Sequence, residues 1–121
     1  RTVLCAYEDD PKDANHAILK ENFELLKSMK DQDGRALEVL KLPMPGAVRR
    51  KDGSRLPASY ANFYIGTDTV MAPTFSHEND AKALEIIARA FPQRKIVGIE
   101  CTAVVHGLGT LHCISQQQPA L

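Results

Sequence analysis

A cysteine near the end of the chain lies in a setting that could support nucleophilic chemistry. Cys113 follows two closely spaced glycines, Gly107 and Gly109, in the stretch HGLGTLHCISQQQPAL. Glycine has no side chain, so the backbone there can approach a ligand closely. A thiolate, the reactive form of cysteine, needs nearby positive charge or hydrogen-bond donors at neutral pH. Two interpretations stay open, a nucleophile or a small buried core residue, which is the commonest fate of a free cysteine.

The residues around Cys113 favour neither an adjacent general base nor a metal site. Residues 110–115 (TLHCIS) are predicted to form a strand, in which successive side chains point to opposite faces. His112 would then point away from Cys113 and serve poorly as its base. Cys101 and His106 add zinc-type ligands, but no pair has the C-x2-C or H-x3-H spacing of a zinc site. We therefore expect no metal.

Acidic residues Glu8, Asp9 and Asp10 follow an apolar, strand-like run. Active-site groups of α/β proteins often lie just after a buried strand. The same acids precede a predicted helix, where carboxylates cap the first turn and complement the helix dipole. Capping is the favoured interpretation.

The remaining charged and histidine residues suggest no chemistry by their spacing. Arg49, Arg50 and Lys51 lie in a long loop and are predicted to form a solvated surface turn, away from any site entrance. His16 and His77 lie near predicted helix starts and receive no role.

Two similar units must position these residues. The expected elements are a strand at 2–7, a helix to about residue 30, a strand at 36–42, a loop at 43–59, a hairpin of 61–65 and 69–73, a helix ending before Pro92, a strand at 95–101, a helical turn at 102–107 and the strand at 110–115. The runs TVLCAY and TVMAPTF occupy the same place in the two units. Only the second unit has a hairpin strand in front. The fold class is therefore α/β, and we expect the first unit to lack a strand that lies upstream.

Composition limits the classes of partner. The chain has 121 residues, of which 44% are hydrophobic, and its fifteen basic residues balance fifteen acidic ones. That size suits one domain, and the balanced charge predicts no nucleic-acid partner and no anionic membrane. No apolar run approaches the roughly 20 residues of a membrane helix. Three cysteines, spaced far apart, are a poor disulfide framework, so a reducing cytoplasm is expected.

The end of the chain resembles the C-terminal signature of agmatine deiminases and of the related bacterial, Porphyromonas-type, peptidylarginine deiminases. That signature has glycines, a small polar residue, an aliphatic residue, His-Cys-Ile, Ser or Thr, and glutamines before a proline. The matching positions are Gly107, Gly109, Leu111, His112, Cys113, Ile114, Ser115, Gln116, Gln117 and Pro119. The segments LPASYANFYI, APTF and AFPQRKIVGIE are also similar. Leu108 stands where the family has its middle glycine, and Thr110 where Asn or Ser is usual.

The resemblance implies a fold and a reaction. The family has the pentein fold, a propeller of five ββαβ units, and residues 1–121 would be the last two units of its catalytic domain. Cys113 would attack the guanidinium carbon, and a covalent amidino adduct would then be hydrolysed, with no metal or cofactor. The backbone at Gly107 and Gly109 would bind substrate. The histidine and carboxylates that complete the family's site would come from upstream residues of the same protein.

The expected substrate is agmatine, which gives N-carbamoylputrescine and ammonia. Peptidylarginine deimination is the alternative activity, and a non-catalytic module with a structural cysteine is the alternative class. The expected partner is thus a small guanidine, and homo-oligomerisation stays open.

Overall fold

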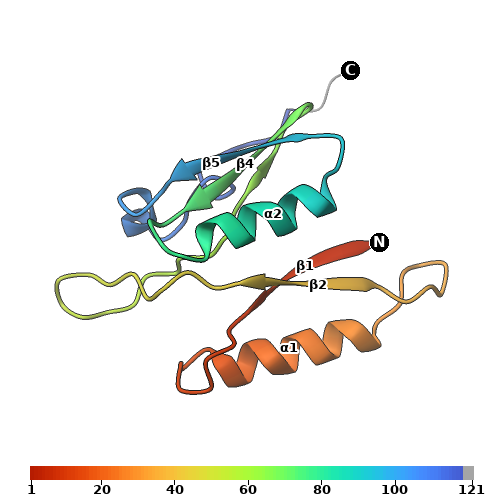
Figure 1. Cartoon of the computed structure of the whole chain (residues 1–121), viewed down its shortest axis with the longest axis horizontal. Helices are drawn as coiled ribbons and strands as arrows, with labels where there is room; N and C mark the ends of the chain where they lie inside the picture. Colours follow the sequence, from red (N-terminus) through yellow and green to blue (C-terminus); the bar gives the residue numbers. More distant parts are fainter. Residues whose placement is uncertain (119–121) are drawn as a thin grey trace.

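The computed structural model describes residues 1–118, so the signature's Pro119 and the end of the predicted domain lie outside the described residues. Two parallel βαβ units follow one another along the chain (Figure 1). The elements are β1 (Thr2–Tyr7), α1 (His16–Ser28), β2 (Glu38–Pro43), β3 (Tyr64–Ile65), β4 (Thr69–Thr74), α2 (Asp80–Ala90), β5 (Lys95–Glu100) and the 3₁₀ helix η1 (Val104–Gly107).

The strand pairing confirms the α/β class and the repeated unit. β1 pairs in parallel with β2, and β4 pairs in parallel with β5. β3 adds an antiparallel strand to the free side of β4, which is the hairpin expected before the second unit. Val3 faces Val39 in the first register, as Val70 faces Ile96 in the second. β-branched residues suit such pleated, half-buried surfaces.

Sheets and helices alternate in layers. Figure 1 shows α2 between the β3–β4–β5 sheet and the β1–β2 pair, with α1 on the other side of that pair. α2 contacts β5 on one side and both β1 and β2 on the other. α1 packs against β1 and β2. Within the described residues, α2 is therefore covered by strands on two sides and α1 on one.

The burial pattern follows these layers. The larger core surrounds α2, and its fully buried members include Leu42, Val70 and Ile87. A smaller core lies under α1, where Phe23 packs edge-on against Tyr7 with ring centroids 5.4 Å apart. Phe23 of α1 and Ile87 of α2 thus face the sheets, as the buried side of an amphipathic helix does.

Residues 110–115 do not form the predicted strand. Thr110 is buried, and the backbone N–H of Ile114 donates to its carbonyl at 3.1 Å, which closes a single helical turn. The backbone N–H groups of His112 and Cys113 bond to Asn62 instead of a neighbouring strand. The short alternating pattern was therefore misleading, and the expected opposite orientation of His112 loses its basis.

Helix α1 ends two residues before the predicted Lys30. The N–H of Met29 donates to the carbonyl of Leu26, and Lys30 already pairs with Ala36 in an isolated bridge. The predicted turn at 102–107 is confirmed as η1, whose last residue is Gly107.

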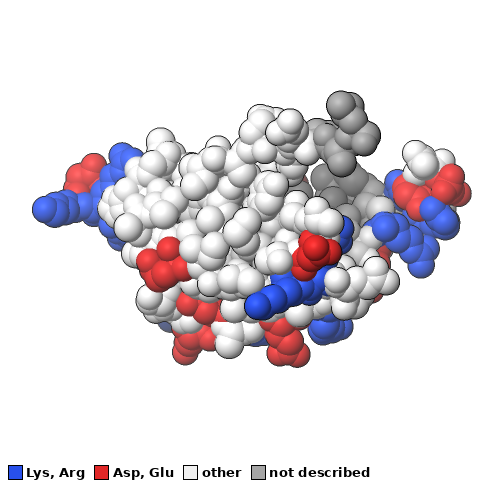
Figure 2. Space-filling view, turned by 90° about the horizontal axis from the view of Figure 1, so that it is seen from above, with Lys and Arg blue, Asp and Glu red and all other residues white. Residues whose placement is uncertain are grey.

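Charges are unevenly distributed over the surface. Figure 2, seen from above the view of Figure 1, shows Lys, Arg, Asp and Glu mainly at the two ends and along one side of this face, with few in its middle. Within residues 1–118, no helix is both long enough and apolar enough to cross a membrane.

Candidate active site

The side chain of Asn62 holds the turn that carries Cys113. Its Nδ2 donates to Cys113 Sγ at 2.9 Å. Its Oδ1 accepts the backbone N–H groups of His112 at 2.9 Å and of Cys113 at 3.2 Å. The backbone carbonyl of Asn62 also accepts from the Thr110 hydroxyl at 3.4 Å. One residue, 51 positions away, thus fixes both the backbone and the sulfur of Cys113.

This arrangement suits a reactive thiol. The side chain of Cys113 is exposed, whereas Cys5 and Cys101 are buried. Burial raises the pKa of the Cys5 and Cys101 thiols, and the nearby charge of Glu100 raises that of Cys101 further. An N–H group aimed at sulfur stabilises negative charge on it. The exposed, hydrogen-bonded Cys113 therefore differs from the buried core cysteine that the sequence left open, while Cys5 and Cys101 fit that description.

The two glycines before Cys113 have different steric surroundings. A Cβ added at Gly109 would lie 2.5 Å from Cys113 Cβ and 2.8 Å from its Sγ. A Cβ added at Gly107 would meet nothing within 4 Å. Gly109 therefore makes room for the cysteine itself, a role that the sequence did not reveal. Gly107 ends η1 without such crowding.

The segment leading to Cys113 is fixed at both ends and exposed in between. Val105 and Thr110 are buried, with at most 1% of their surfaces accessible. Leu108 lies between them with a left-handed backbone (φ 71°) and a side chain that is 63% exposed. Glycine adopts that conformation without a steric penalty, so a glycine at this position, as in the family signature that the sequence resembles, would avoid the strain that Leu108 bears.

Asn62 is the candidate site residue that sequence reasoning missed. It lies within LPASYANFYI, a segment used only to extend the resemblance. Neither its type nor its spacing from Cys113 predicts a contact. The signal available was its presence in that segment, just before β3.

The zinc-type side chains considered from the sequence do not lie together. Within residues 1–118, no group of three or more His, Cys, Asp or Glu side chains could hold a metal ion. Cys101 is fully buried, whereas His106, His112 and Cys113 are exposed. The described residues therefore offer no composite zinc site.

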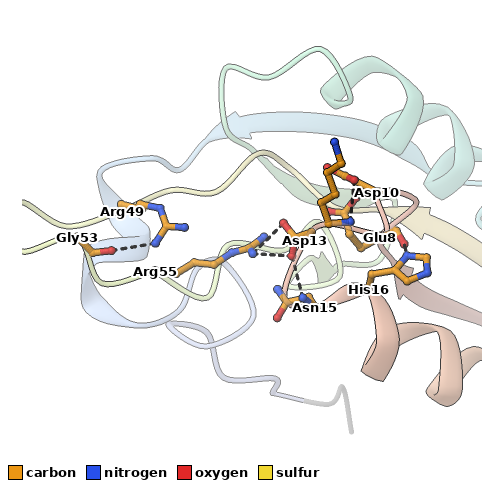
Figure 3. Close-up of polar contacts among 9 residues, drawn as sticks. Glu8, Asp10, Asp13, Asn15, His16, Arg49, Gly53 and Arg55 are labelled. Carbon is orange, nitrogen blue, oxygen red and sulfur yellow. Dashed lines mark hydrogen bonds and ion pairs between the residues drawn. The ribbon is translucent and has the colours of Figure 1, made fainter.

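The acidic residues after β1 do not cap α1, contrary to the prediction. α1 has no acidic residue in its first turn. Glu8 Oε1 accepts the N–H of Asp10, and Asp10 Oδ1 accepts the N–H of Lys12, so these carboxylates order their own loop. Figure 3 shows the Glu8 carbonyl beside His16, whose Nδ1 lies 2.7 Å from it.

A partly buried ion pair between Asp13 and Arg55 joins the loop after β1 to the long loop after β2. Arg55 donates to both carboxylate oxygens of Asp13, at 2.7 and 2.9 Å, and the N–H of Asn15 donates to the same carboxylate (Figure 3). Hydrogen bonds from Arg55 and from the Asn15 backbone lower the pKa of Asp13. The ion pair therefore connects the first unit to the loop that leads toward Asn62.

The basic residues form an exposed hairpin, as expected. Arg49 pairs with Arg55 in an isolated bridge, and its guanidinium donates to the Gly53 carbonyl at 2.9 Å (Figure 3). Arg50 extends from this hairpin to the carbonyl of His106, at 3.0 Å. The hairpin thus touches the segment that leads to Cys113, which the sequence did not predict. His77 Nδ1 accepts a local bond from the Asn79 N–H, at 3.2 Å.

The chain matches known proteins over nearly its whole length. Residues 1–119 match the family described as Porphyromonas-type peptidyl-arginine deiminase. A protein named "putative agmatine deiminase" from Marinomonas is 38% identical over 92% of this chain and 34% of its own length. Another with that name from Latilactobacillus sakei is 38% identical over 98% and 37%. The chain therefore spans about a third of the length of these curated relatives.

Solved structures show the same fold. A structure described as the putative arginine deiminase of Porphyromonas gingivalis superposes with a TM-score of 0.94 at 36% identity, and covers 98% of this chain and 35% of that one. The agmatine deiminase of Enterococcus faecalis gives a TM-score of 0.89 at 34% identity, with 98% and 37% covered.

Proposed function

Because this chain belongs to the Porphyromonas-type peptidyl-arginine deiminase family, we propose that it is the C-terminal third of an enzyme that hydrolyses a guanidinium group. Cys113 is the proposed nucleophile. The observation that carries the proposal is the exposed Cys113 sulfur, which accepts a hydrogen bond from the Asn62 side chain at 2.9 Å.

The proposed reaction has two halves. The thiolate of Cys113 attacks the guanidinium carbon, so that a C–S bond forms and a tetrahedral adduct results. One nitrogen takes a proton and leaves as ammonia, and a planar amidino group remains on sulfur. Water then adds to the same carbon, the C–S bond breaks, and a ureido product is released with the thiolate restored. Asn62 holds the sulfur in place through both halves.

The reaction needs groups that the Cys113 turn does not supply. A guanidinium ion is resonance-stabilised and cationic, so carboxylates must hold it and oppose its charge. A proton donor must also serve the leaving nitrogen and then activate water. We place these groups in the remaining two-thirds of the protein, in keeping with relatives about three times as long as this chain.

The layer order supports a pentein ring with further units. α2 lies between two groups of strands, but α1 has strands on only one side. The uncovered face of α1 carries Ile18, Leu25 and Met29, which are 66%, 53% and 43% exposed. Their spacing of seven and four residues places them on one helical face. A preceding ββαβ unit would cover this face as β1 and β2 cover α2, and five such units complete the pentein propeller.

The proposed substrate is agmatine, converted to N-carbamoylputrescine and ammonia. The relatives named as agmatine deiminases support this choice. Peptidylarginine is the second candidate, favoured by the match to the family with that description. Measuring turnover of agmatine, free arginine and an arginine-containing peptide by the complete protein tests the choice. Preference for the peptide would show agmatine to be wrong.

Replacing Cys113 tests the mechanism. Cys113→Ala in the complete enzyme should lower turnover by several orders of magnitude, because a nucleophile and its partners act as a unit. Cys5→Ala is the matched control, since it removes a buried thiol from β1 and should leave kcat nearly unchanged. Ureido-product formation and mass spectrometry of a trapped adduct give the two readouts. Turnover of Cys113→Ala within tenfold of the wild type would show that Cys113 is not the nucleophile. Absence of turnover by the wild type itself would favour the non-catalytic module.

A further inference from the structure

Asn62 is anchored by a buried tyrosine two residues earlier in the chain. The Tyr60 side chain is fully buried, and its hydroxyl donates to Asp80 Oδ1 at 2.6 Å. Its ring packs edge-on against Phe75, with centroids 5.6 Å apart. Asp80 is the first residue of α2. The tyrosine therefore ties the segment before β3 to the start of a helix in the larger core.

Asp80 gathers several donors onto one carboxylate. Besides the Tyr60 hydroxyl, it accepts the backbone N–H groups of Phe75 at 3.1 Å and of His77 at 3.1 Å. Burial by itself would raise the pKa of Asp80, but these hydrogen bonds outweigh it and lower the pKa. Burial and the Asp80 charge raise the pKa of Tyr60. Tyr60 therefore keeps its proton and donates, and Asp80 keeps its charge and accepts.

Tyr60 and Asn62 belong to one tight turn. The N–H of Asn62 donates to the Ser59 carbonyl at 3.3 Å, and the N–H of Ala61 donates to the Ser59 hydroxyl at 3.2 Å. Tyr60 enters the core from this turn, while Asn62 bonds to the turn of Cys113. In so short a turn, movement of Tyr60 carries Asn62 with it.

We propose that Tyr60 and Asp80 are positioning residues for the reaction at Cys113, and that they act by fixing the Asn62 amide against the sulfur. The proposal rests on the proposed deiminase function. Neither residue touches the substrate. Their bond holds the Asn62 turn where three groups of the Cys113 turn meet its side chain: the sulfur and the backbone N–H groups of His112 and Cys113.

Tyr60→Phe tests the proposal, because it removes only the hydroxyl and keeps the packed ring. In the complete enzyme it should lower kcat about tenfold and change KM less than about twofold, since a small misplacement of a reacting group slows the chemical step. Phe23→Leu is the matched control, because Phe23 lies in the separate core under α1. It should lower the Tm comparably and leave kcat within about twofold.

A double-mutant comparison separates positioning from general weakening. If Tyr60 acts through Asn62, adding Tyr60→Phe to Asn62→Ala should lower kcat by less than about twofold further. A full further tenfold loss would overturn the proposal. Asp80→Asn should repeat the Tyr60→Phe phenotype, and Tyr60→Phe alone decides the matter where Asp80→Asn fails to fold.

Alkylation of Cys113 by iodoacetamide provides a readout that needs no substrate turnover. The rate for Tyr60→Phe should differ from the wild type by at least about threefold, because the amide no longer holds the sulfur. If the wild type turns over no guanidine, the deiminase function fails while this rate still reports on positioning. Alkylation and kcat both within about twofold of the wild type would overturn the positioning role.

Discussion

Gly109→Ala should displace the thiol of Cys113. The new methyl carbon would lie 2.5 Å from Cys113 Cβ and 2.8 Å from Sγ, whereas carbon atoms in contact prefer about 3.5–4.0 Å. To remove this overlap, the Cys113 side chain must move by roughly 1 Å from the new methyl group. Overpacking of this kind costs about 1–3 kcal/mol. A displacement of about 1 Å at a reacting group can cost about 10²-fold in rate. We expect kcat to fall about a hundredfold.

Gly107→Ala provides the matched control. It adds the same methyl group to the same segment, but nothing lies within 4 Å of it. Its turnover should stay within about threefold of the wild type. The assay measures ureido-product formation by the complete enzyme, with the rate of Cys113 alkylation by iodoacetamide as a second readout. Both readouts should change strongly for Gly109→Ala and little for Gly107→Ala.

Two results would refute this reasoning. Near wild-type turnover in Gly109→Ala would mean that the turn of Cys113 accommodates the methyl group. Equal losses in both variants would mean that the two glycines act by letting backbone approach the substrate, as the sequence alone suggests, and that room for the thiol is not the reason for Gly109.

Three other changes test separate features in the complete enzyme. Leu108→Gly should raise the free energy of unfolding by up to about 1 kcal/mol, because it relieves a left-handed backbone at some cost in chain entropy; a lower Tm would contradict this. Arg55→Ala should lower the free energy of unfolding by about 1 kcal/mol at neutral pH, because it removes the ion pair with Asp13. Because the pKa of Asp13 is lowered in the folded state, its contribution is present above the ordinary value of 3.8 and is lost as pH falls through the lowered value. The Tm difference between Arg55→Ala and the wild type should therefore shrink below pH 3.8, and a constant difference would argue against the ion pair. Cys5→Ala and Cys101→Ala should lower the Tm but keep kcat within about twofold, and a tenfold loss would give one of these thiols a catalytic role.

Much of the fold could be predicted because its signals are local. The apolar run of β1 and the helical spacing of Leu84 and Ile87 each show, within one short segment, which side of the element is buried. The GTD segment between two apolar runs likewise indicates a hairpin, and β3 pairs antiparallel with β4. The similarity of the two TV runs predicted the repeated unit, because each feeds a helix and a returning parallel strand.

The acids after β1 show why a local rule can fail. Glu8, Asp9 and Asp10 have the right types for an N-cap, but α1 begins only at His16. The intervening loop uses the carboxylates of Glu8 and Asp10 for its own turns and that of Asp13 for Arg55. Arg55 lies 42 residues away from its partner, so no local pattern marks the pair.

The contact between Asn62 and Cys113 is likewise marked by no local pattern, because the two residues lie 51 positions apart. The local structure around Cys113 was also predicted wrongly. In a strand at 110–115, the backbone N–H groups of His112 and Cys113 would point in opposite directions, so no single acceptor could take both. In the observed turn they converge on Asn62 Oδ1. That leaves Asn62 Nδ2 free to point at the sulfur, which stays exposed for a substrate. The local structure that the sequence pattern concealed is therefore what allows one asparagine to hold both the backbone and the sulfur of the proposed nucleophile.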